Sequence, residues 1–249
     1  MLRLLYGGFK YFKHDKTDLK EDTKRFRKSF FPAIWGNSTA QFSAFLDTWL
    51  ATFLVTGSIS YLYYANRVFH LPLALFAIAT SVAIFPRISK YIRHERFKEA
   101  DKAFYTAFWF LCSLLTFSTI GGYLLSHEIV CLLFERGAFN PADSQNTASV
   151  LQMYMIGLLP FGLSKLLSLK LYAEHRQGEA AKIATYSLGG NIILSLALIS
   201  PLGAMGLALA SSLSGLILFV YTLKAYGTQR FLVIISNKNP FWLLLASAI

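Results

Sequence analysis

Residues 57–89 place a charged side chain inside an apolar run that is long enough to cross a membrane. The run reads GSISYLYYANRVFHLPLALFAIATSVAIFPRIS and contains Arg67. A membrane-spanning helix needs about 20 predominantly apolar residues. An arginine at membrane depth costs about 2.5–3.5 kcal/mol on insertion scales, so it usually faces a cavity or a partner instead of lipid. The run therefore predicts a membrane helix in which Arg67 meets an anionic ligand or a carboxylate.

The composition of the whole chain supports a membrane protein. Hydrophobic residues make up 55% of the sequence and charged residues only 15%, and the mean hydropathy is +0.46. A soluble core does not need so apolar a chain. Apolar runs of spanning length occur at residues 30–54, 59–85, 104–126, 150–173, 183–200 and 203–225. We therefore expect an all-α integral membrane protein with six complete spans.

The chain divides into four predicted parts. Residues 1–29 form a basic linker, 30–225 the six-helix transmembrane lobe, 226–240 a loop, and 241–249 the start of a seventh span. The last segment would cover only about 13 Å as a helix, which is less than half the membrane. We therefore expect a seventh span that is truncated.

The distribution of lysine and arginine predicts the orientation of the spans, because these residues accumulate in cytoplasmic loops. The leading segment and the loops around residues 87–102, 176–182 and 224–238 are basic, whereas the intervening loops hold little positive charge. Both ends of the lobe should therefore be cytoplasmic. The net charge of +11 is explained by these span ends. It points to anionic lipid headgroups, with no need for a nucleic-acid partner.

Polar side chains follow helical lines along the first predicted span. Asn37, Gln41, Thr48 and Thr52 fall near one line, and Ser43 and Asp47 form a neighbouring line. Residues three or four apart share a helix face. The first span should therefore present one polar face.

The second predicted span also carries a polar group. Tyr63, Arg67 and His70 share a face, flanked by Asn66. Pro72 removes a backbone donor and crowds the preceding turn, so it should kink the helix beside Arg67. A kinked, polar-faced helix is typical of a transport cavity. The alternative is that Asp47 and Arg67 pair with each other and simply hold the two helices together.

Two lysines mark the cytoplasmic half of the fourth predicted span. Lys170 is close enough to the span end for its side chain to extend to the interface. Lys165 lies deeper by about 7 Å, so it has two interpretations, a cavity residue or a second extended side chain.

The sequence shows no enzyme signature. It has no phosphate-binding glycine loop, no histidine and cysteine set at metal-binding spacing, and no nucleophile beside a base. Transport, with no catalytic residues, is therefore the predicted class of activity.

Three segments resemble one known family. Residues 57–89, the run LFERGAFNPADSQNTA at 133–148 and the run YMIGLLPFGLSKLLSLKLYA at 154–173 are similar to the MurJ (MviN) family of lipid II flippases. The resemblance extends over nearly the whole chain. It implies the C-terminal lobe, from the seventh helix to the start of the thirteenth, of the multidrug/oligosaccharidyl-lipid/polysaccharide exporter fold. The N-terminal lobe would then be a missing partner from the same protein.

This resemblance implies a function. Lipid II, an undecaprenyl-pyrophosphate disaccharide-pentapeptide, would move from the cytoplasmic to the outer leaflet of the bacterial inner membrane by alternating access. Arg67 matches a cavity arginine of the family, and Asn66, His70 and Lys165 would line the same substrate cavity. The position before the arginine is commonly aspartate in the family, so Asn66 removes a local counter-ion.

Some members of this family have a sodium site in this lobe. The resemblance implies that Asp47 supplies its carboxylate, Asn191 and Ser211 its side-chain ligands, and Leu207 a backbone carbonyl. Ser195 stands where a second carboxylate is expected, which should weaken sodium binding or shift the coupling toward protons, because hard cations favour oxygen ligands. The coupling ion is therefore Na⁺ or H⁺.

Two other functions remain open from the sequence. The chain could belong to an exporter of another polyprenyl-linked glycan or of drugs. It could also be an inactive structural half-transporter.

Overall fold

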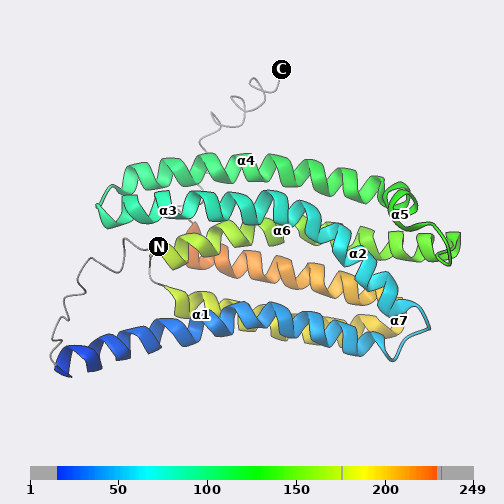
Figure 1. Cartoon of the computed structure of the whole chain (residues 1–249), viewed down its shortest axis with the longest axis horizontal. Helices are drawn as coiled ribbons and strands as arrows, with labels where there is room; N and C mark the ends of the chain where they lie inside the picture. The colour runs from blue at the N-terminus through cyan, green and yellow to red at the C-terminus, as the bar shows by residue number, and fades with distance from the viewer. Residues whose placement is uncertain (1–15, 175, 229–230, 232–249) are drawn as a thin grey trace, which may run out of the picture.

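The computed structural model describes residues 16–174, 176–228 and 231, in which every regular element is a helix (Figure 1). The elements are α1 Lys16–Ala51, α2 Ser58–Pro72, η2 Leu73–Ile78, α3 Ala79–Arg93, α4 Phe97–Leu124, α5 Ser126–Phe134, α6 Pro141–Ala173 and α7 Gln177–Tyr226. The predicted all-α fold is confirmed. The predicted seventh span and the first half of the predicted basic linker lie outside the described residues. The rest of that linker belongs to α1.

Four continuous helices of the described part are long and apolar enough to cross a membrane. They are Ser58–Arg93, which joins α2, η2 and α3, then Phe97–Leu124, Pro141–Ala173 and Gln177–Tyr226. Each coincides with one or two of the spans predicted from the sequence. The helix α1 is not among them, because the polar residues along its face dilute its hydropathy. That α1 also crosses the membrane stays a prediction.

The helix α7 folds back on itself at Gly203. This glycine has φ 56° and ψ −130°, a backbone conformation that residues with a Cβ rarely adopt. Hydrogen bonds join Asn191 to Ser211 and Ser187 to Ser214, so positions progressively farther from the turn meet in pairs. The two arms, 177–202 and 204–226, are therefore antiparallel, and they correspond to the fifth and sixth predicted spans.

The connections gather at two ends of the bundle. At one end, on the left in Figure 1, lie the start of α1, the α3–α4 turn and the junction between α6 and α7. At the other end lie the α1–α2 turn and α5. The connections predicted to be cytoplasmic and those predicted to be external are thus separated as the charge pattern requires. Which end faces the cytoplasm stays a prediction.

The helix α6 is the central element of the bundle. It packs against α2, α4, α5 and both arms of α7, whereas α1 packs mainly on α7. Its start is fixed by a capping box, because the Asn140 side chain accepts from the Asp143 backbone N–H and the Asp143 carboxylate accepts from the Asn140 backbone N–H. Tyr61 of α2 donates to the same carboxylate at 2.8 Å. The N-terminal ends of α2 and α6 are therefore tied together.

A π-helical stretch follows Pro72, where the sequence predicted a kink; the kink itself stays a prediction. The α-helix α2 ends at Pro72, and η2 follows at once before α3 continues the same span. A π-helical turn adds a residue to the helix and rotates the next turns about the helix axis. The polar face that carries Arg67 is therefore offset from the face of α3.

The motif at residues 133–148 closes the loop between α5 and α6. The Glu135 carboxylate accepts from Ser144 Oγ at 2.6 Å and from Cys131 Sγ at 2.9 Å. These hydrogen bonds, the one from Cys131 first, hold the pKa of the Glu135 carboxyl below its ordinary value. Cys131, in α5, is thus a free thiol that contacts this loop through Glu135.

Lys170 corrects one expectation. Its side chain is only 5% exposed and does not extend to the interface. It donates to the Asp101 carboxylate of α4 at 2.5 Å, and its ammonium lies 5.5 Å from the centre of the Phe104 ring. Spacing along α6 could not reveal a carboxylate contributed by another helix. The pair joins α4 to α6.

We expect the replacement of Asp101 by alanine to destabilise the protein by about 2–3 kcal/mol, because it leaves the buried lysine unpaired. This is below the range for fully buried pairs, because the Asp101 side chain is 42% exposed. Thermal unfolding of the purified protein in detergent measures the effect. Adding Lys170→Met should restore most of the loss, and a double variant as unstable as Asp101→Ala would contradict this explanation.

Candidate functional site

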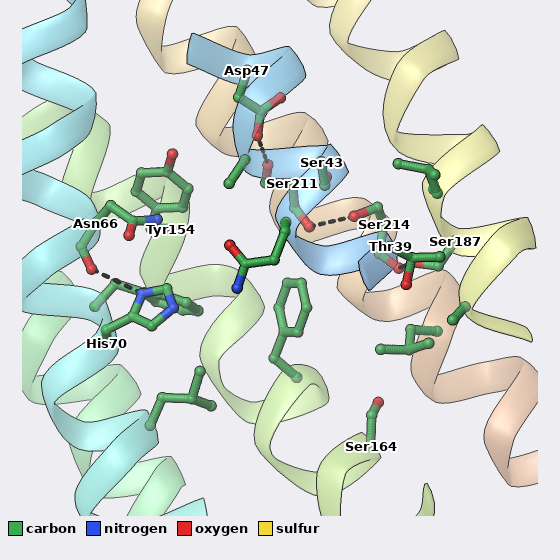
Figure 2. Close-up of a pocket in the computed structure, with 18 of the residues that line it drawn as sticks. Thr39, Ser43, Asp47, Asn66, His70, Tyr154, Ser164, Ser187, Ser211 and Ser214 are labelled. Atoms are coloured by element: carbon green, nitrogen blue, oxygen red, sulfur yellow. Dashed lines mark hydrogen bonds between the residues drawn. The ribbon is translucent and has the colours of Figure 1, made fainter. Parts of the chain in front are cut away.

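A cavity of about 670 Å³ lies between α1, α2, α6 and the two arms of α7. Figure 2 shows its polar side chains, which come from all of these helices and point toward one another. All four predicted substrate-cavity residues, Asn66, Arg67, His70 and Lys165, line it. The structure therefore brings together side chains that lie about 100 residues apart in the sequence.

The polar face predicted for α1 faces this cavity. Gln41, Ser43, Asp47 and Thr48 all line it. Thr52 does not, and its hydroxyl donates to the Trp49 carbonyl at 2.6 Å. The side chain of Asn37 is outside the described part of the structure. The sequence thus predicted the orientation of α1 correctly over its central turns.

Arg67 is held by its own helix. Its Nη2 donates to the Tyr63 hydroxyl at 2.5 Å, and its guanidinium carbon lies 4.8 Å from the centre of the Tyr63 ring. The ring nitrogen Nδ1 of His70 lies 3.1 Å from the Asn66 carbonyl oxygen. Among the described residues, no carboxylate pairs with Arg67. The alternative in which Arg67 and Asp47 pair to hold two helices together is therefore wrong for this structure.

Lys165 is an exposed residue on the cavity wall of α6. Ser164 and Ser168 line the same wall. Of its two predicted environments, the structure favours the cavity. Two cations, on α2 and on α6, therefore face one space.

Asp47 is the centre of a buried polar group. It is 8% exposed, and its two carboxylate oxygens accept from Ser211 Oγ at 2.6 Å and from Ser195 Oγ at 3.3 Å. The hydrogen bond to Ser211 is drawn in Figure 2. The Asn191 amide nitrogen donates to Ser211 Oγ at 3.2 Å. Three predicted ion ligands are therefore joined by hydrogen bonds between α1 and the two arms of α7.

The oxygen atoms of this group suit a hard cation. In the described part of the chain, no donor lies within hydrogen-bond distance of the buried Asn191 Oδ1. A buried amide oxygen without a partner is costly, and a cation would satisfy it. Leu207, the predicted carbonyl ligand, is fully buried one turn before Ser211 on the same arm. The group thus offers one carboxylate, two hydroxyls and an unpaired amide oxygen.

The cavity is suited to binding an anionic ligand. It presents two cations to an anionic ligand, and its carboxylate is engaged by serine hydroxyls. The site therefore fits the recognition of a negatively charged group at membrane depth.

Several cavity residues were missed by the sequence analysis. Tyr154, Ser187 and Ser214 line the cavity, yet they stand in spans where small and aromatic residues are fully explained by packing. The Ser187 hydroxyl donates to the Ser214 carbonyl at 2.8 Å, and the Ser214 hydroxyl to the Ser211 carbonyl at 2.8 Å. The sequence could not identify these three residues as cavity residues, because spacing along one helix does not reveal which arm of a helical hairpin faces which neighbour.

Comparisons with known proteins agree on one family. The sequence model described as "Lipid II flippase MurJ" matches residues 4–249. A "Probable lipid II flippase MurJ" of Helicobacter pylori (strain J99) is 51% identical over 97% of this chain and 54% of its own length. The protein of the same name from Haemophilus influenzae is 34% identical over 84% of this chain and 41% of its own length.

Solved structures show the same fold. A lipid II flippase MurJ in an inward closed conformation matches with a TM-score of 0.73 and 28% identity, over 91% of this chain and 49% of that chain. An outward-facing multidrug resistance transporter of the MATE family and MOP superfamily also matches with a TM-score of 0.73, at 17% identity over 83% of this chain and 45% of that chain. The exporter fold is therefore confirmed. The chain spans about half the length of the curated relatives it matches. On the family model and these identities, the chain belongs to the lipid II flippase MurJ family.

Proposed function

We propose that this chain is a lobe of a flippase that moves lipid II from the cytoplasmic to the outer leaflet of the bacterial inner membrane. The observation that carries the proposal is the cavity, in which Arg67 and Lys165 face one space between membrane-length helices. Such cations suit a pyrophosphate, which accepts several charge-assisted hydrogen bonds. Family membership supports lipid II as the lipid, and the activity belongs to the whole protein.

The cavity residues would have different roles in binding the headgroup. Arg67 would bind the pyrophosphate, with Lys165 adding charge and Asn66 and His70 adding polar contacts, while the polyprenyl tail stays in lipid. Rocking of this lobe against its partner lobe would then expose the headgroup on the other side. A membrane potential that is negative inside favours the outward movement of negative charge, by about 2.3 kcal/mol per charge per 100 mV.

The Asp47 group would hold the coupling ion. We propose Asp47, Asn191, Ser211 and the Leu207 carbonyl as ligands of Na⁺, or Asp47 as the acceptor of H⁺. The unpaired Asn191 oxygen favours a metal ion, because a proton on Asp47 would leave that oxygen without a partner. With Ser195 hydrogen-bonded to Asp47, the group has one carboxylate, so its affinity for Na⁺ should be modest.

The proposed function is tested with the whole protein as it is encoded, reconstituted into liposomes that contain fluorescent lipid II. We expect the fraction of lipid II that a membrane-impermeant quencher reaches to rise with protein density, because the protein equilibrates the headgroup between leaflets. A fluorescent phosphatidylglycerol, which is anionic but lacks the pyrophosphate and the polyprenyl tail, is the control lipid. Exchange of lipid II no faster than in protein-free liposomes would refute the flippase.

A further inference from the structure

Tyr154 lies between the Asp47 group and the face of α2 that carries Arg67. It is a cavity-lining residue of α6 and only 6% exposed. Its hydroxyl interacts electrostatically with the side chain of Asn66, next to Arg67, and with the Asp47 carboxylate. Figure 2 shows Tyr154 beside Asn66, on the side of the cavity formed by α2. Tyr154 therefore contacts α2 and also interacts electrostatically with the Asp47 carboxylate of α1.

The backbone at Tyr154 is attached to the same arm of α7 that binds Asp47. The Ser212 hydroxyl donates to the Met153 carbonyl oxygen at 2.6 Å and also lies 3.3 Å from the Tyr154 carbonyl oxygen. Its neighbour Ser211 donates to Asp47. Consecutive residues of a helix point about 100° apart, so this pair of serines contacts α6 on one side and α1 on the other. A displacement of Ser211 is therefore transmitted to the backbone of Tyr154.

The contact between this arm and α6 is close enough to act as a rigid joint. A Cβ placed on Gly157 would lie 2.7 Å from the Ser212 Cα, so the two backbones touch one turn after Met153. Packed interiors transmit displacements because they contain few voids. The two helices should therefore move as one unit at this level.

The ring of Tyr154 also fixes the orientation of α2. It packs on the buried Phe69 with ring centres 5.6 Å apart and planes inclined by 33°. Phe69 lies two residues after Arg67, so the tyrosine contacts α2 on both sides of the arginine, through Asn66 and through Phe69. Rotation of α2 about its axis would break one or both of these contacts.

We propose that Tyr154 is a positioning residue that links the state of the Asp47 group to the orientation of Arg67 toward an anionic headgroup. The link runs from Asp47 through Ser211 and Ser212 to the Tyr154 backbone, and from the Tyr154 hydroxyl and ring to α2. This inference rests on the proposed function, because the headgroup is the ligand of Arg67 there. It adds a residue that neither binds the ion nor provides a cation.

The test is a double-mutant cycle on headgroup affinity, measured with undecaprenyl pyrophosphate and the whole protein in detergent. We expect Asp47→Asn to weaken binding about fivefold in the wild-type background, because the Ser211 contact that anchors the arm is weakened. In a Tyr154→Phe background, which lacks only the hydroxyl, the same change should alter affinity by less than about twofold. A purely structural tyrosine would leave the Asp47→Asn effect unchanged, which would overturn the proposal.

Two further variants make the result specific. Tyr221→Phe, at an exposed tyrosine of α7 outside the cavity lining, removes the same atom and should leave the Asp47→Asn effect intact. Asn66→Ala removes the partner of the Tyr154 hydroxyl and should abolish the effect as Tyr154→Phe does, so the proposal remains testable if Tyr154→Phe folds poorly. No effect of Asp47→Asn in the wild type would also overturn the link. Absence of binding by the wild type would instead refute the proposed function.

Discussion

Replacement of Arg67 by alanine, in the whole protein, is expected to abolish lipid II exchange while leaving the protein folded in the membrane. Among the described residues, its guanidinium hydrogen-bonds to Tyr63 and pairs with no carboxylate, so it can still donate to a ligand in the cavity. A hydrogen bond to a charged group contributes about 1.5–3 kcal/mol, so loss of the contact should lower headgroup affinity about 10- to 100-fold. Growth rescue of cells depleted of their own flippase and the liposome exchange rate both measure the effect.

The matched control for this variant is Arg87→Ala. Arg87 lies in α3, the continuation of the same span, but stacks on Tyr91 outside the cavity. Its loss should leave rescue and exchange near wild-type values. Arg67→Lys should retain part of the activity, because the charge remains while the two-pronged hydrogen-bonding geometry is lost. Full rescue by Arg67→Ala would exclude a role for this residue in the cavity.

Local spacing was enough to predict the polar faces of the site. On α1, Gln41, Ser43, Asp47 and Thr48 line the cavity because helical periodicity fixes which residues share a face. The same periodicity groups Arg67 with Tyr63, and the two side chains do meet. The sequence also predicted that Arg67 faces a cavity or a partner, because placing its charge in lipid is costly.

Contacts between different helices could not be predicted from spacing along a single helix. Lys170 was expected at the interface, but its partner Asp101 lies on another helix, 69 residues earlier. Tyr154 gave no signal, because a buried tyrosine in an apolar span is equally suited to packing. The resemblance to a family did predict the meeting of Asp47, Asn191 and Ser211, which periodicity could not have done, since they come from α1 and two arms of α7.

The second large effect is expected from Asp47→Asn, which should abolish the dependence of transport on its coupling ion. Asp47 is the single carboxylate of its buried group, and the substitution keeps its shape while removing its charge. Without that charge the remaining oxygens are neutral dipoles, which hold Na⁺ weakly, and asparagine cannot accept a proton as aspartate does. Exchange in liposomes under imposed Na⁺ or H⁺ gradients should then be the same with and without the gradient.

The complementary variant Ser195→Asp identifies the ion. The Ser195 hydroxyl already lies 3.3 Å from the Asp47 carboxylate, so the substitution adds a second carboxylate beside the first. Two adjacent carboxylates repel each other unless a cation lies between them, so Na⁺ should stabilise this variant more than the wild type in a thermal unfolding assay. If H⁺ is the coupling ion, protonation relieves the repulsion instead, and unfolding should depend on pH with little response to Na⁺. Transport by Asp47→Asn that still follows an ion gradient would place the coupling site elsewhere in the protein.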